Sequence, residues 1–182
     1  VVKSGQTTLA QCATPNWSTE EAQKRMANLV TANGYGPMGV KLDAVLSSND
    51  SVANGITKAL VATGYTKDNF PILTGQDYDN PAFKNMLQGT QSISIFKDTR
   101  TLASKVVEMV NSILKDTAVD VNDTRTYGNG SGIIPSYLCD PVFATVDTYK
   151  ELLVDSLKPK YEFDTTTTQD YSNTTTATIP TV

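Results

Sequence analysis

Two aspartates, Asp77 and Asp79, stand two positions apart in the stretch "GQDYDN", directly after the apolar run "FPIL". Carboxylates at this spacing could bind calcium, act as an acid and base pair, cap a helix or bind a polar ligand. The calcium hypothesis fails, because an EF-hand calcium loop needs an oxygen ligand, a glycine and a glutamate at the positions of Pro81, Ala82 and Gln88. A carboxylate pair for glycoside hydrolysis has no other support in the chain. This leaves Asp79 as a helix cap and Asp77 beside it as a candidate for ligand binding.

The composition excludes much of catalytic and metal chemistry. The chain of 182 residues contains no histidine, so neither Ser-His-Asp nor Cys-His triads can form. Two cysteines cannot build a four-cysteine zinc site, and we expect neither a metal nor a cofactor. Cys12 and Cys139 could pair in an oxidising compartment or be two separate buried thiols; the sequence leaves both open. The net charge of −4, without a basic stripe, argues against nucleic acid as a partner.

Strand-like and helix-like runs alternate along the chain. Capping residues and turn glycines mark the helices: Ser18 with Glu21 before the first, Asp79 or Asn80 before the third, and Asp98 before the fourth. This alternation predicts an α/β domain with a mainly parallel sheet. The expected strands are 1–5, 41–48, 70–75 and 92–96, with an extended stretch at 132–145, and the expected helices are 18–34, 52–63, 81–88, 99–115 and 146–154.

Polar side chains follow the expected strands where each strand ends. The strand ends "SSND", "TGQD" and "IFKD" carry Asn49, Gln76, Asp77, Lys97 and Asp98. In parallel α/β sheets, ligands bind beside the carboxyl ends of the strands. We therefore expect a binding site at this rim.

Three long segments then resemble a known family: "FPILTGQD", "LQGTQSISIFKDTRTLASKVVEMVNSIL" and "VNDTRTYGNGSGIIPSYLCDPV". They resemble the C-terminal half of bacterial multiple-monosaccharide-binding proteins of ABC transporters. "VVKSGQTT", "NW" and "LDAVLSSND" extend the likeness to residues 1–157. The resemblance implies the parallel-sheet sandwich of the C-terminal lobe of a type I periplasmic binding protein, in which two α/β lobes close on one sugar.

The resemblance also implies the site residues. The second lobe of such proteins offers a Trp, an Asn, an Asp and a Lys or Asn in that order, and the matching positions are Trp17, Asn49, Asp77 and Lys97. A Trp face can pack against the C–H face of a pyranose. Asp77 would accept hydrogen bonds from sugar hydroxyls, Asn49 would donate and accept, and Lys97 would donate.

The resemblance further divides the chain. It implies a sugar-binding lobe over 1–97, a hinge crossing with a helix of the first lobe over 98–127, a return over 128–162 and a Thr-rich tail over 163–182. The first lobe itself is expected to be largely absent, and the start "VVKSGQTT", without a leader, favours a processed or truncated chain. We expect the apolar stripe of helix 99–115 to fold back, or to be buried in a partner chain by dimerisation or swapping.

The function that the resemblance implies is sugar binding without catalysis. The chain would be the substrate-binding component of an ABC importer and would deliver xylose, glucose, arabinose or galactose to a membrane permease. Its location would be periplasmic or extracytoplasmic, as a cell-surface lipoprotein in a Gram-positive cell. The first alternative is a sugar-sensing lobe that acts on a chemoreceptor or two-component receptor. The second is a sugar-active enzyme.

Overall fold

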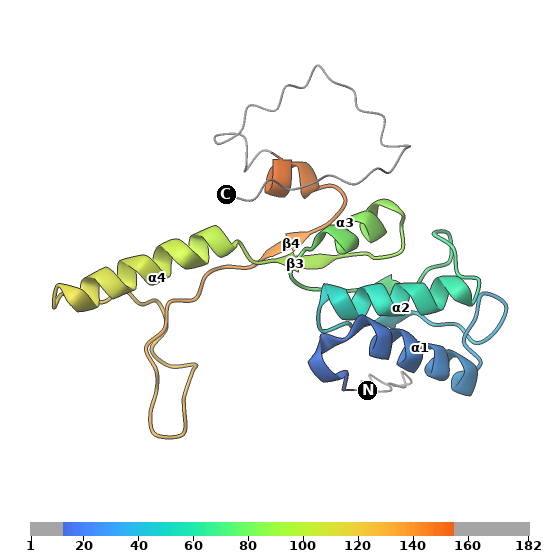
Figure 1. The fold of residues 1–182 in the computed structure, drawn as a ribbon, viewed down its shortest axis with the longest axis horizontal. Helices are drawn as coiled ribbons and strands as arrows, with labels where there is room; N and C mark the ends of the chain where they lie inside the picture. The colour runs from blue at the N-terminus through green and yellow to red at the C-terminus, as the bar shows by residue number, and fades with distance from the viewer. Residues whose placement is uncertain (1–12, 155–182) are drawn as a thin grey trace, which may run out of the picture. The chain divides into compact units, whose positions relative to one another are not determined.

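A computed structural model describes residues 13–154 of the chain, which fall into two units, one ending at Tyr149 and one beginning at Lys150. Figure 1 shows the order of the elements. The helices of the first unit are η1 (Pro15–Trp17), α1 (Thr19–Asn33), α2 (Asp50–Ala62), α3 (Asn80–Leu87) and α4 (Thr99–Leu114). Its strands are β1 (Ala44–Val45), β2 (Ile72–Leu73), β3 (Ser94–Phe96) and β4 (Val142–Ala144), and η2 (Lys150–Val154) is the described part of the second unit.

The strands form two pairs of opposite sense. β1 and β2 are parallel, with Val45 opposite Leu73, whereas β3 and β4 are antiparallel, with Ile95 opposite Phe143. Two further backbone bonds, from Ile95 N–H to Gly75 O and from Asp77 N–H to Ile95 O, tie β3 to the segment after β2 in a parallel pattern. The α/β class is confirmed, but the mainly parallel sheet is not: the named strands form one parallel and one antiparallel pair, because the chain returns beside β3 as β4.

Local capping chemistry places the helices where the sequence predicts them. The Ser18 hydroxyl accepts a hydrogen bond from the N–H of Glu21, and Gly34 ends α1 in the left-handed region at φ +66°. Of the two candidate caps for α3, Asp79 is the one: its carboxylate accepts from Ala82 N–H at 2.8 Å. Asp98 caps α4 in the same way, through Arg100 N–H at 2.9 Å.

The hydrophobic core lies where α1 packs against α2, as Figure 1 shows. Gly55 in α2 allows this close approach, because a Cβ there would lie 2.2 Å from the carbonyl oxygen of Thr19 and 2.8 Å from Cβ of Ala22. Leu60 of α2 and Leu73 of β2 are completely buried in the same core. The other buried members of the cluster are Ala22, Met26, Val30, Val52, Ala53, Ile56, Ala59 and Tyr65.

Helix α4 differs from α1, α2 and α3 because none of its residues is buried. The expected helix is confirmed, and its apolar side chains are open to solvent, among them Leu102, Val106, Val110 and Ile113. Within residues 13–154, α4 therefore does not fold back to bury its apolar side. On the polar side, Lys105 pairs with Asp120 of the following segment at 3.1 Å. No helix within residues 13–154 is long and apolar enough to cross a membrane.

Several expectations fall at the edges of the described range. The expected strand 1–5, Cys12 and the tail 163–182 lie outside the described residues. The predicted helix 146–154 is found only as the π-helical turn η2, and the expected strands 41–48 and 70–75 are reduced to two residues each, β1 and β2. The boundaries proposed at 97, 127 and 162 stay predictions.

Candidate functional site

The segments that follow β1, β2 and β3 meet at one edge of the strands. The N–H of Asp50 donates to the carbonyl oxygen of Gln76 at 2.9 Å, which joins the start of α2 to the segment after β2. The N–H of Asp77 donates to Ile95 O at 2.9 Å, which joins that segment to β3. The carboxyl ends of the strands therefore lie side by side, as the sequence predicts for a parallel arrangement.

Asp77 and Lys97 come together at this edge. The Asp77 Oδ1 and Lys97 Nζ atoms are 3.0 Å apart, and each side chain is about half exposed, at 49% and 50%. Their charges are thus satisfied by each other while both remain open to a ligand from solvent. Asp77 has φ +100° and the next residue, Tyr78, has φ +59°, a backbone that side-chain-bearing residues rarely adopt.

Asn49 has a structural role that the sequence analysis did not assign. Its Oδ1 accepts a hydrogen bond from Val52 N–H at 3.1 Å and so caps α2. This engages the accepting oxygen, and the amide nitrogen is then the group that can donate to a ligand. The signal for the cap was present in the sequence, since Asn is a preferred residue directly before a helix.

Trp17 is the last residue of η1, directly before Ser18, the cap of α1, and is 62% exposed. Both Trp17 and Asn16 lie in the left-handed region, at φ +50° and +55°. The hydroxyl of Thr19 donates to the carbonyl of Ser51 at 2.9 Å, which fastens the start of α1 to the start of α2. Hydrogen bonds thus join the segments that carry Asn49, Asp77 and Lys97, and Trp17 belongs to the adjoining helix start.

The sequence analysis missed Asp50, which is completely buried beneath this edge. Its carboxylate accepts from Ser94 Oγ at 2.8 and 2.9 Å, from Gln91 Nε2 at 2.9 Å and from Asp79 N–H at 3.1 Å. Burial raises the pKa of the Asp50 carboxyl, and the hydrogen bonds from Ser94 and Gln91 oppose that rise. Its place directly after the cap Asn49 gave no signal of burial, because an acidic residue is common in the first turn of a helix.

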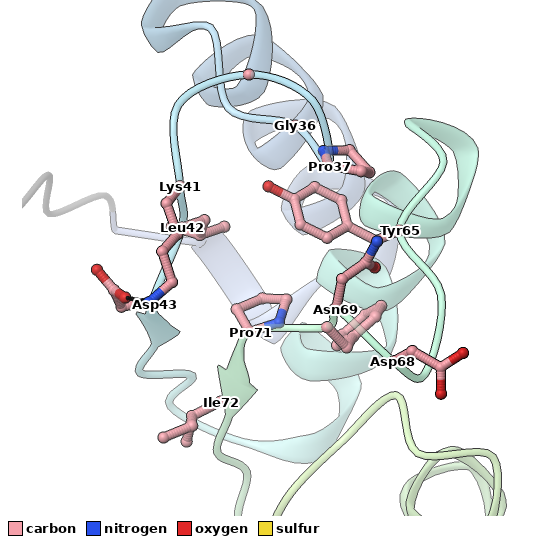
Figure 2. Close-up of a pocket in the computed structure, with 12 residues that line it drawn as sticks. Gly36, Pro37, Lys41, Leu42, Asp43, Tyr65, Asp68, Asn69, Pro71 and Ile72 are labelled. Carbon is pink, nitrogen blue, oxygen red and sulfur yellow. Dashed lines mark ion pairs between the residues drawn. The ribbon is translucent and has the colours of Figure 1, made fainter.

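The pocket in Figure 2 lies at the opposite end of the strands. It is a cavity of about 580 Å³, and Figure 2 shows Asp43 and Ile72 at the beginnings of β1 and β2. Its charged groups pair locally, Lys41 with Asp43 at 2.5 Å and Asp68 with Lys67 at 3.2 Å. None of the four predicted site residues lines it. Because ligands of parallel sheets bind at the carboxyl ends, we take the rim around Asp77 as the candidate site.

Comparison with known proteins identifies the family of the chain. The model of the periplasmic binding protein domain family matches residues 1–118. The chain is 41% identical over 157 residues to the multiple sugar-binding periplasmic receptor ChvE of Rhizobium radiobacter, covering 85% of this chain and 44% of that protein. It is 42% identical over 157 residues to the multiple sugar-binding periplasmic protein SbpA of Azospirillum brasilense, covering 85% of this chain and 43% of that protein.

A solved structure is also similar to this chain. An ABC transporter solute binding protein from Clostridium phytofermentans with bound β-D-glucose is 58% identical, with a TM-score of 0.71 over 77% of this chain and 42% of that one. The chain thus spans less than half the length of these relatives. The expectation of a binding protein rather than an enzyme is confirmed by the family. The α/β fold and these similarities show that the chain belongs to the periplasmic binding protein domain family.

Proposed function

We propose that this chain is the C-terminal lobe of the substrate-binding component of a sugar ABC importer. The observation that carries the proposal is its 58% identity to a solute binding protein that holds β-D-glucose. In the proposed protein, a first lobe and this lobe close on one monosaccharide. The sugar-binding lobe would comprise residues 1–97 and 128–162, with 98–127 crossing to the first lobe and 163–182 forming a tail.

The sugar would bind at the rim through Trp17, Asn49, Asp77 and Lys97. Asp77 accepts hydrogen bonds from ring hydroxyls, and Lys97 donates to a hydroxyl or to the ring oxygen. Their 3.0 Å separation supports this role, because adjacent hydroxyls of a sugar need an acceptor and a donor side by side. Asn49 donates from its amide, since its oxygen caps α2. The exposed ring of Trp17 offers an apolar face for the C–H groups of the sugar.

A single lobe provides only one wall of the cleft, so the 182-residue chain alone should bind sugar weakly or not at all. We expect no heat of binding when this chain is titrated with glucose, xylose, arabinose or galactose at micromolar concentration. The two-lobe protein that contains the chain should bind at least one of these sugars with micromolar or tighter affinity. Isothermal titration calorimetry on both proteins makes the comparison.

Two outcomes would overturn parts of this proposal. Micromolar binding by the 182-residue chain would show that the second wall is not needed. Failure of the two-lobe protein to bind any of the four sugars would refute the monosaccharide assignment.

The proposal extends to location and partners. The relatives ChvE and SbpA are named as periplasmic proteins, and we infer a periplasmic or other extracytoplasmic location for this chain. A membrane permease would receive the sugar. A sensor function is the second candidate, favoured by the name of ChvE, a receptor. Binding of the sugar-loaded two-lobe protein to permease-containing vesicles, but not to a chemoreceptor sensor domain, would select transport; the reverse would select sensing.

We also propose that the apolar side of α4 is buried in a second copy when the chain is on its own. Leu102, Val106, Val110 and Ile113 recur along one side of the helix and are each about half exposed or more. Sedimentation velocity of the 182-residue chain should therefore show association that rises with concentration.

A pair of matched variants tests this contact. Val110→Lys places a charge within the apolar stripe and should give a monomer. Asn111→Lys places the same charge on the polar side of α4 and should leave association unchanged. A wild-type chain that stays a monodisperse monomer at about 100 µM, well above the dissociation constants of ordinary specific interfaces, contradicts the proposal.

A further inference from the structure

The buried carboxylate of Asp50 is surrounded by uncharged donors. Oδ1 accepts from Gln91 Nε2 and from Ser94 Oγ, both at 2.9 Å, and Oδ2 accepts from Ser94 Oγ at 2.8 Å and from Asp79 N–H at 3.1 Å. Asp50 and Ser94 are both completely buried. Burying a carboxylate that is held only by hydrogen bonds costs free energy, so its presence here needs a structural explanation.

Two hydrogen bonds connect Asp50 and Ser94 to the loop of residues 77–79, which carries Asp77, the residue proposed to bind the sugar. Asp79 donates its backbone N–H to Asp50, and Tyr78 donates its backbone N–H to Ser94 Oγ at 3.1 Å. Two consecutive amides of the loop are therefore held by one buried pair of side chains, Asp50 and Ser94. Without this pair, both amides would be buried without their acceptors.

The loop needs such support because its backbone is unfavourable. Asp77 and Tyr78 have φ +100° and +59°, conformations that cost about 1–3 kcal/mol each in residues with side chains. Gly75 shows how closely the loop approaches the carboxylate, because a Cβ there would lie 1.9 Å from Asp50 Oδ1. This backbone sets the direction of the Asp77 side chain, which meets Lys97 at 3.0 Å.

We propose that Asp50 is a positioning residue of the sugar site: its buried carboxylate, with Ser94, holds residues 77–79 in the strained conformation that directs Asp77 towards Lys97 and the ligand. The inference rests on the proposed function, since it assigns a role within that same site. Asp50 itself does not contact the sugar. Its effect on affinity passes through the loop.

Two measurements test the proposal, one of which does not depend on sugar. The first is amide hydrogen exchange of Tyr78 and Asp79 in the 182-residue chain, and the second is glucose affinity in the two-lobe protein. In Asp50→Ala we expect both amides to exchange about tenfold faster or more, and the glucose Kd to rise about tenfold or more, as loss of one or two buried hydrogen bonds predicts. Amides in the middle of α1 should keep their protection.

The matched control is Thr57→Ala in the same helix. Thr57 is buried, and its hydroxyl donates to Thr90 O at 3.1 Å, away from the loop. This variant should lose stability yet leave the glucose Kd within about twofold, because it removes one hydrogen bond that does not reach the site. If Thr57→Ala weakens glucose binding as much as Asp50→Ala does, the effect is general destabilisation and the proposal fails.

Two further variants keep the proposal testable if Asp50→Ala does not fold. Ser94→Ala removes the acceptor of Tyr78 N–H and should raise exchange and Kd in the same direction. Asp50→Asn keeps an oxygen for Asp79 N–H, and Gln91 can turn its buried Oε1, which has no partner among the described residues, towards the new amide. Asp50→Asn should therefore restore most of the affinity.

The outcomes separate this inference from the function on which it rests. Unchanged exchange at Tyr78 and Asp79 in both Asp50→Ala and Ser94→Ala would overturn the positioning role, whatever the sugar result. A two-lobe protein that binds no sugar would refute the proposed function alone, while faster exchange at these amides would still support the role of Asp50 in holding the loop.

Discussion

Replacing Asp77 with alanine in the two-lobe protein should weaken glucose binding by a factor of about 10² to 10⁴. The estimate assumes two hydrogen bonds from sugar hydroxyls to the carboxylate, each contributing about 1.5–3 kcal/mol in a closed, dry cleft. The substitution also deprives Lys97 of the partner that lies 3.0 Å away. Calorimetric titration with glucose measures the change, and circular dichroism establishes that the variant is folded.

Asp43→Ala is the matched control for Asp77→Ala. Asp43 is also an exposed aspartate paired with a lysine, Lys41 at 2.5 Å, but it lies at the beginning of β1, away from the rim. Exposed ion pairs contribute about 0–1 kcal/mol, so this control should change neither stability nor glucose affinity appreciably. Wild-type affinity in Asp77→Ala would remove Asp77 from the site.

Replacing Gly55 with alanine should destabilise the chain by about 3 kcal/mol, at the upper end of the range for overpacked cores. The new Cβ would lie 2.2 Å from the carbonyl oxygen of Thr19 and 2.9 Å from the backbone nitrogen of Gln23. Both are backbone atoms of α1, so no side-chain rotation relieves the clash and the two helices must move apart. Urea denaturation of the 182-residue chain measures the loss.

Gly132→Ala is the control for Gly55→Ala. A Cβ at Gly132 would meet nothing within 4 Å, so the free energy of unfolding should change by less than about 0.5 kcal/mol, as for ordinary surface substitutions. Equal stability of Gly55→Ala and Gly132→Ala would mean that α1 does not pack on α2 as closely as described. Since Trp17 stands directly before Ser18, the cap of α1, the Gly55 variant should also weaken sugar binding in the two-lobe protein.

Local chemistry accounts for the parts of the fold that the sequence predicts well. Ser18, Gly34, Asp79 and Asp98 act within one turn of their own helix, so their caps follow from neighbouring residues alone. Strand pairing depends on residues far apart in the chain. Nothing near β3 indicates that β4, almost fifty residues later, will pair with it in the antiparallel sense.

The candidate site likewise contains residues that the sequence predicts and one that it does not. The strand ends predict that Asn49, Asp77 and Lys97 gather at one rim, and the structure places their segments there. Asp50 could not be recognised from its own neighbourhood, because its partners Gln91 and Ser94 lie 41 and 44 residues away. The roles of Trp17, Asn49, Asp77 and Lys97 towards a sugar come from the resemblance and stay predictions.

The caps have a consequence for the kind of ligand that the rim can hold. In each of the helices α1 to α4, the capping side chain already accepts one of the first backbone amides: Ser18, Asn49, Asp79 and Asp98 do so in turn. Proteins that hold phosphate at a helix start instead leave those amides to the anion. With one amide at each helix start engaged and the carboxylates of Asp77 and Asp79 close by, we expect the rim to favour uncharged ligands over anions. In the proposed site, the ligand would be recognised by side chains and not by helix dipoles.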